Sequence, residues 1–189
     1  MHRWLFLSLI AALVGTVAGC TEEDPAPLFM DIRYQVRCVD CEPRAPDDPV
    51  RDVELLDGEQ GYTIMCRANT RDGDRLLTFS TTFINPDMES ENFSISVLQV
   101  NLDDDDPGSD CSVQVKEGSN TYEGDCTSGD PTVEEPCSVD FSVDGDVVTG
   151  EIFCADVPNR NMAMTKRHLV APGEEEEGAQ FELHGCTGL

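Results

Sequence analysis

The sequence predicts an all-β domain, an antiparallel β-sandwich of about eight to ten strands that disulfides stabilise. Three observations support this prediction. Apolar and polar residues alternate in many short segments, turn-forming residues separate these segments, and no long amphipathic helix interrupts them. A closed β-barrel is the alternative arrangement for the same strands.

The first half of the domain begins with a clearly alternating segment. In residues 30–38 every second side chain, such as Ile32 and Tyr34, is apolar, which predicts a half-buried strand. Residues 50–56 fit either a short strand or one or two turns of helix. Further strands are expected at 61–68 and 77–83, on either side of a turn at Asp72-Gly73.

The alternation changes phase within residues 93–102, and the second half of the domain contains two similar hairpins. Phe93, Ile95 and Val97 share one face, but the next apolar residues fall at Leu98, Val100 and Leu102. This shift predicts a β-bulge or a strand buried on both faces. Hairpins follow at 111–126 and 137–154, and the last expected strand spans 179–185.

The first twenty residues have the features of an export signal. Arg3 supplies a positive start, and residues 4–19 are apolar or small without interruption. A secretory signal peptide has this pattern, and the run is too short for a membrane-spanning helix, which needs about 20 apolar residues.

The apolar run ends in Val17-Ala18-Gly19-Cys20, which resembles the lipobox of bacterial lipoproteins. The resemblance implies that the leader is cleaved before Cys20, that its thiol receives a diacylglyceryl group and that the new amino terminus is acylated. It also implies a place in the bacterial envelope. Thr21 stands where an Asp would signal retention in the inner membrane, so the outer membrane is the expected location. The alternative is an ordinary leader and free secretion.

The number of cysteines agrees with lipidation of Cys20. The chain has nine cysteines, so one is left over if the others pair. With Cys20 given to lipid, eight remain for four disulfides, as expected in an oxidising compartment. These eight are Cys38, Cys41, Cys66, Cys111, Cys126, Cys137, Cys154 and Cys186. The expected organisation is therefore a signal peptide at 1–19, a lipidated and acidic tether at 20–29, and one domain at 30–189.

Symmetry within the two hairpins predicts two of the disulfide pairs. The midpoint of the first hairpin is Gly118-Ser119 and that of the second is Gly145-Asp146, both good turn dipeptides. Folding there places the cysteines of each hairpin opposite one another, within disulfide range. The preferred pairs are Cys111–Cys126 and Cys137–Cys154. The competing possibility is that these sulfurs cross to the other sheet, with Cys66 as acceptor; the remaining cysteines stay unassigned.

The charge of the chain limits its partners. Lys and Arg number 12 against 38 Asp and Glu, a formal net charge of −26. Nucleic-acid binding needs a basic surface and is therefore excluded. Attachment to a membrane is expected through the N-terminal lipid, and the remaining candidate partners are cations or basic proteins. The oligomeric state does not follow from the sequence.

Two motifs are candidate chemical sites. Cys38 and Cys41 have the spacing of a redox pair, but they follow a strand and precede a proline-rich loop, so a structural disulfide is favoured over redox catalysis or zinc. An acidic loop gathers oxygen ligands of the kind that Ca²⁺ prefers, although a solvated loop is favoured and no cofactor is expected. Its acids are Asp103, Asp104, Asp105, Asp106 and Asp110.

The sequence thus predicts a membrane-anchored envelope lipoprotein whose acidic β domain has a binding or structural role without catalysis. No nucleophile motif or phosphate-binding loop occurs in the sequence. The alternative is a secreted hydrolase or carbohydrate-active protein that uses an unidentified pair of carboxylates. A pocket holding two carboxyls with raised pKa values would distinguish this alternative.

Overall fold

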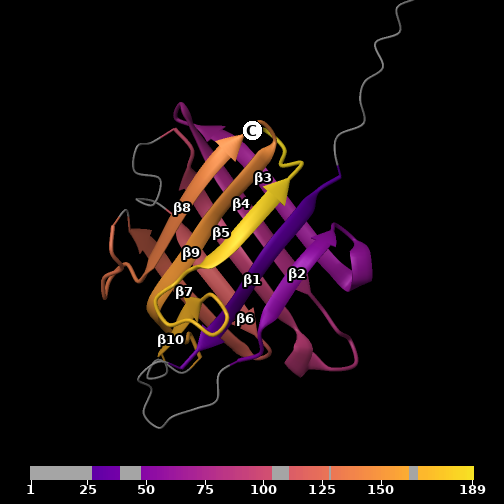
Figure 1. The fold of residues 1–189 in the computed structure, drawn as a ribbon, viewed down its shortest axis with the longest axis vertical. Coiled ribbons are helices and arrows are strands. Elements are labelled where there is room, and N and C mark those ends of the chain that lie inside the picture. Colours follow the sequence, from indigo (N-terminus) through magenta and orange to yellow (C-terminus); the bar gives the residue numbers. More distant parts are fainter. Residues whose placement is uncertain (1–26, 39–47, 104–110, 128, 162–165) are drawn as a thin grey trace, which may run out of the picture.

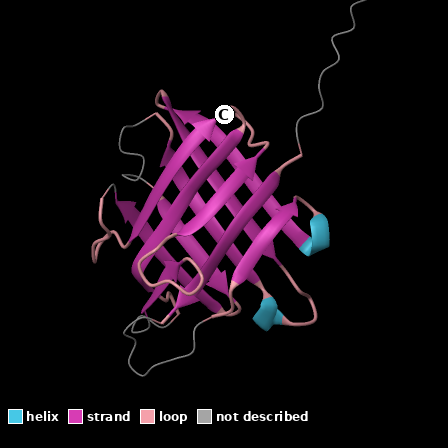
Figure 2. Cartoon of the chain, viewed as in Figure 1, coloured by secondary structure: helices cyan, strands magenta, loops and turns pink. Residues whose placement is uncertain are grey.

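A computed structural model describes residues 27–38, 48–103, 111–127, 129–161 and 166–189 of the chain. Eleven strands and two single-turn 3₁₀ helices occupy these ranges, so the all-β prediction is confirmed (Figure 2). The strand that the alternation did not predict is β10 (Lys166–Val170). It has only five residues, and three basic side chains begin it, which hides the period of two.

The strands form two layers (Figure 1). The front layer contains β1 (Phe29–Arg37), β2 (Arg51–Leu56), β8 (Cys137–Asp144), β9 (Val147–Pro158), β10 and β11 (Ala179–His184). The back layer contains β3 (Tyr62–Arg71), β4 (Asp74–Phe83), β5 (Phe93–Asn101), β6 (Ser112–Glu117) and β7 (Asn120–Thr127). The short helices are η1 (Glu59–Gly61) and η2 (Glu89–Glu91).

Hydrogen bonds connect both layers into one folded sheet. The back layer runs in the order β7-β6-β5-β4-β3, and the front layer runs β8-β9-β11-β1-β2, with β10 beside β1 and β9. All pairings between these strands are antiparallel except β7 with β8, which joins the layers in parallel. The layers cross steeply in Figure 1, as in sandwiches of the orthogonal kind.

The core between the layers follows from the alternation of apolar residues. The predicted inward positions of the first strand, Ile32 and Tyr34, are fully buried, as is Leu183 on the last strand. Phe79 on β4 packs against Phe181 on β11 with 4.7 Å between ring centroids, which connects the two layers. Such burial, at roughly 25 cal/mol per Å² of apolar surface, is the main stabilising contribution to a fold of this kind.

Two ambiguous segments are resolved by the structure. Residues 51–56 form a strand, β2, whose Val53 is fully buried against β1. The phase shift in β5 is a β-bulge: Leu77 pairs with Val100, whereas Phe79 pairs with Val97. Gln99 adopts a positive φ of 62° there, and Leu98 is 37% exposed rather than buried as its apolar character suggested. The bulge turns both Val97 and Val100 inward.

Three disulfides lie within the described residues. Two join Cys111 to Cys126 and Cys137 to Cys154, the pairs that hairpin symmetry favoured, and the third joins Cys66 to Cys186. The crossing of hairpin sulfurs to Cys66 does not occur. The registers agree with the predicted midpoints, because Val115 pairs with Tyr122 and Val139 with Ile152.

The described part of the chain begins just before the first strand. β1 begins at Phe29, and Leu28 packs against the core. The lipobox and Cys20 lie outside the described residues. In the part of the chain that the structure describes, no helix has the length and apolar character needed to cross a membrane.

Candidate functional site

Acidic side chains gather on the outer face of the front layer. Glu54 on β2, Asp31 on β1 and Glu182 on β11 are direct cross-strand neighbours, and all three are exposed. We call these three residues the acidic row. Beyond Glu182 the same line continues across β9 and β8 with Thr149 and then Ser142. The row exists because each acid takes the polar position of an alternating strand, which directs it away from the core.

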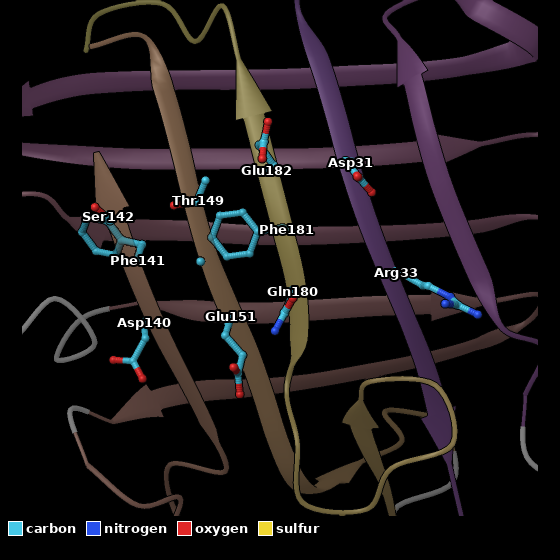
Figure 3. A pocket seen from close by; sticks show the side chains of 11 residues that line it. Asp31, Arg33, Asp140, Phe141, Ser142, Thr149, Glu151, Gln180, Phe181 and Glu182 are labelled. Atoms are coloured by element: carbon cyan, nitrogen blue, oxygen red, sulfur yellow. The ribbon is translucent and has the colours of Figure 1, made fainter. Parts of the chain in front are cut away.

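An open groove of about 740 Å³ runs across this face (Figure 3). Its lining includes Asp31 and Glu182 from the acidic row, and Asp140 and Glu151 from a second line of cross-strand neighbours. Arg33 is the basic residue of the lining. The groove therefore presents four carboxylates and one guanidinium to solvent.

Close packing forms the floor of the groove at Gly150. A Cβ at this position would lie 2.6 Å from the ring of Phe181, which extends inward toward the back layer, and would also collide with the carbonyl oxygen of Asp140. Only glycine permits this approach of β9 to its neighbours. Phe141 and Phe181 flank Gly150 on β8 and β11, so apolar rings lie beneath the charged rim.

Repulsion within the acidic row affects its central member. The pKa of Asp31 is raised, first by partial burial and then by the negative charges of Glu54, Asp52 and Glu182. Glu182 has a partner in His184, and Asp52 lies 3.5 Å from Nε of Arg33. Among the described residues, neither Asp31 nor Glu54 has a basic side chain within ion-pair distance. Like charges directly opposite in a sheet destabilise it, and a bound cation would relieve that repulsion.

The outer face of the back layer also has lines of cross-strand neighbours, but these lines contain few acids. One line of cross-strand neighbours contains only hydroxyls and a lysine, and the next contains a single acid. The first line is Thr63, Thr82, Ser94, Lys116 and Thr121, and the second is Met65, Ser80, Ser96, Gln114 and Glu123. The acids of the sandwich are therefore concentrated on one of its two outer faces.

A second carboxylate cluster lies between the layers, at Glu117 on β6. Glu117 is 4% exposed, and burial raises its pKa, although hydrogen bonds from Arg51 oppose the rise. Arg51 Nε donates to Oε2 at 3.0 Å, Nη2 donates to the same oxygen, and the hydroxyl of Tyr34 donates to Oε1 at 3.2 Å. The guanidinium also lies 4.4 Å from the ring centroid of Phe93. Both Glu117 oxygens are thus occupied.

The surroundings of Glu117 are relevant to the alternative function, a hydrolase that uses a pair of carboxylates. A cleft of about 340 Å³ borders Glu117 and also Asp48 and Glu89, and the charge of Asp48 contributes to the raised pKa of Glu117. Arg51 lies in the same lining and forms a bidentate pair with Glu117. Proton transfer from a carboxyl held in this way to a substrate would first have to break its bonds to Arg51 and Tyr34.

The predicted calcium loop is only partly described. Asp103 is bound to Arg75 through Nη2–Oδ1 at 2.7 Å and through the Arg75 backbone N–H at 2.7 Å. These contacts lower the pKa of Asp103 and occupy the oxygens that a metal would need. Asp104, Asp105, Asp106 and Asp110 lie outside the described residues. Within the described ranges, no group of three or more His, Cys, Asp or Glu is placed to hold a metal ion.

The remaining predicted sites concern cysteines. All seven described cysteines are disulfide-bonded, including Cys38, whose partner lies outside the described residues. Cys41 lies outside them as well. The sequence did not identify the acidic row or the Arg51–Glu117 pair, because each joins strands far apart in the chain. The available signal was the acids at polar positions of the alternating segments, at Asp31 and Glu182.

Comparison of the chain with protein families, with curated protein sequences and with solved structures found no match.

Proposed function

We propose that the outer face of the front layer is a binding surface for a cationic partner, such as a lysine-rich segment of a basic protein. One observation carries this proposal. Asp31 and Glu54 stand side by side beside an open groove, and no basic side chain among the described residues neutralises them. A cationic ligand would supply that charge, and the groove of about 740 Å³ has room for several side chains.

We further propose that the domain is held at the bacterial envelope by lipid on Cys20. The Val17-Ala18-Gly19-Cys20 sequence supports this proposal, and so does the number of cysteines. Six of the seven described cysteines pair with one another, and Cys38 needs a partner from outside the described residues. If that partner is Cys41, the cysteine left over is Cys20. A short tether would then hold the acidic groove near the membrane surface.

A binding role fits the domain better than catalysis. The buried carboxyl with a raised pKa, Glu117, uses both oxygens on Arg51 and Tyr34. The exposed carboxyl with a raised pKa, Asp31, lies in an open groove that does not exclude water, which weakens electrostatic stabilisation of a transition state.

Anchoring is tested by expression of the full chain in a Gram-negative host with radiolabelled palmitate. Wild-type protein should incorporate the label and partition into detergent, and Cys20→Ser should do neither. Cys41→Ser is the matched control, because it changes a cysteine outside the lipobox and should keep the label. Label that persists in Cys20→Ser would contradict the anchor.

Binding is tested by titrating the full-length Cys20→Ser protein with a lysine-rich peptide at low ionic strength. We expect saturable binding that weakens as salt is added, because exposed charges are screened beyond about 10 Å at 0.1 M salt. A glutamine-rich peptide of equal length serves as the control. Equal binding of both peptides, or no binding of either, would contradict the cationic partner.

A further inference from the structure

The strand β3 is an edge of the back layer, and its outer side is covered by two short segments. Among the described strands it pairs only with β4. Toward its start, the backbone N–H of Gly58 donates to the carbonyl of Tyr62 at 3.1 Å, and the N–H of Ile64 donates to Oδ1 of Asp57 at 2.8 Å. A ten-residue edge strand needs such cover, because unpaired backbone groups are a template for another strand.

The second half of this edge is covered by the end of the chain. We call residues 185–189 the C-terminal strap. The N–H of Ala68 donates to the carbonyl of Thr187 at 2.8 Å, and the N–H of Thr187 donates to the carbonyl of Cys66 at 3.2 Å. Next to this contact, a Cβ on Gly188 would collide with the carbonyl oxygen of Ala68. The strap therefore occupies the place of a neighbouring strand, although it is only a few residues long.

A single covalent bond fastens the strap. The Cys66–Cys186 disulfide connects β3 to residues 120 positions later in the chain. Cys66 and Cys186 are 4% and 7% exposed, whereas the four cysteines of the hairpin disulfides are at most 2% exposed. The Cys66–Cys186 bond is therefore the least enclosed of these three disulfides.

The strand β3 lacks the negative charge that would keep two copies apart. The chain carries a net charge of −26, but β3 has no acidic residue and has two arginines, Arg67 and Arg71. When two β3 edges meet, the strands themselves therefore bring no acids face to face. An antiparallel approach of two identical edges is also a closed, two-fold arrangement.

We propose that the C-terminal strap is a disulfide-locked cover of the β3 edge, and that opening the Cys66–Cys186 bond lets this edge pair with β3 of a second copy. A dithiol reductant opens the bond. The reductant is oxidised to a disulfide, and the two electrons and two protons that it gives up convert Cys66 and Cys186 to thiols. The strap is then held only by its hydrogen bonds near Ala68. Its release exposes the second half of β3 to strand addition.

The test combines hydrogen exchange with sedimentation of the full chain carrying Cys20→Ser. In the Cys66→Ser/Cys186→Ser variant, the Ala68 amide should exchange at least about tenfold faster than in the parent, and dimers should increase with concentration. Adding Ala68→Pro to that variant should restore the monomer, since proline lacks the N–H that edge pairing needs. Unchanged exchange at Ala68 would overturn the locked cover, and dimers that survive Ala68→Pro would overturn pairing through this edge.

A second variant tests the same proposal in case the serine variant does not fold. Truncation after Cys186 keeps the disulfide but removes Thr187, whose backbone covers Ala68. The Ala68 amide should again lose protection while Cys66 and Cys186 remain bonded. A monomer at every concentration in both variants, with Ala68 unprotected, would overturn the proposed partner. Neither variant alters the acidic groove, so the lysine-rich peptide should still bind.

Discussion

Glu117 and Asp31 are two carboxyls with raised pKa values, and the causes of the two shifts differ. Burial raises the pKa of Glu117, and the structure supplies Arg51 and Tyr34 as partners. Partial burial and three neighbouring acids raise the pKa of Asp31, which has no basic partner among the described residues. The fold thus neutralises the acid it buries, and it leaves the exposed acid without a basic partner among the residues that the structure describes. An unsatisfied acid beside a groove is available to a ligand.

The largest expected effect comes from removing the buried member of this comparison. Glu117→Ala should lower the free energy of unfolding by up to about 3 kcal/mol, because Arg51, whose side chain is only 13% exposed, loses the carboxylate that it binds. Asp31→Ala should cost far less. Urea unfolding of both variants measures the difference. The double variant Arg51→Met/Glu117→Leu is the control: it should recover most of the loss, since it removes both charges together.

An equal loss in Glu117→Ala and Asp31→Ala would contradict the distinction between a satisfied and an unsatisfied acid. So would a double variant as unstable as Glu117→Ala, because the loss would then come from packing rather than from the unpaired Arg51.

The second expected effect is a pH dependence of opposite sign at Glu117 and Asp103. Folding raises the pKa of Glu117, so the native state keeps its proton where the unfolded chain has lost it. The stability of the wild type relative to Glu117→Gln should therefore fall as pH rises through the range above the ordinary value of 4.5. Hydrogen bonds from Arg75 lower the pKa of Asp103, so its contribution is present above the ordinary value of 3.8 and is lost as pH falls below it.

Unfolding free energies of wild type, Glu117→Gln and Asp103→Asn between pH 3 and 8 measure these two slopes. The differences from wild type cancel the titration of the other acids. Slopes of the same sign at Glu117 and Asp103 would contradict the assigned causes. The Asp103 effect should be the smaller one, because the Arg75–Asp103 pair is partly exposed to solvent.

The smallest expected effect is an increase in stability when one charge of the acidic row is removed. Asp31→Asn removes the central charge of the acidic row and should raise the free energy of unfolding by about a few tenths of a kcal/mol, because like charges no longer face each other across β1 and β2. Thermal unfolding at low and high salt measures the gain, which should shrink as salt screens the row. Ser96→Ala on the back layer removes no charge and should show no such salt dependence. A loss of stability in Asp31→Asn would contradict repulsion within the row.

The sequence predicted what depends on local pattern. The period of two placed Ile32 and Tyr34 inward, and turn symmetry placed Cys111 opposite Cys126, because the partners of a hairpin are close in the chain. The order of distant strands was not available from such patterns. Asp31 and Glu182 meet only because the last strand inserts beside the first, so the acidic row could not be foreseen.

Two further differences have local causes. β10 was missed because Lys166, Arg167 and His168 fill three of its five positions, although Arg167 faces the interior and is buried. Leu98 was expected inward by its apolar character, but the bulge at Gln99 directs it outward. A sequence pattern reports the average period of a strand, and a bulge interrupts that period at one residue.

We propose that the acidic face, rather than net charge alone, binds the cationic partner. The most direct test compares two variants that remove carboxylates from opposite faces of the Cys20→Ser protein. Glu54→Gln/Asp31→Asn takes two charges from the acidic row, and Glu123→Gln/Asp125→Asn takes two from the back layer. Titration with the lysine-rich peptide should give a dissociation constant about tenfold larger for the front variant, because two exposed ion pairs of up to about 1 kcal/mol each are lost. The dissociation constant of the back variant should change little. Equal weakening in both variants would contradict a binding face and would leave only the net charge of the chain.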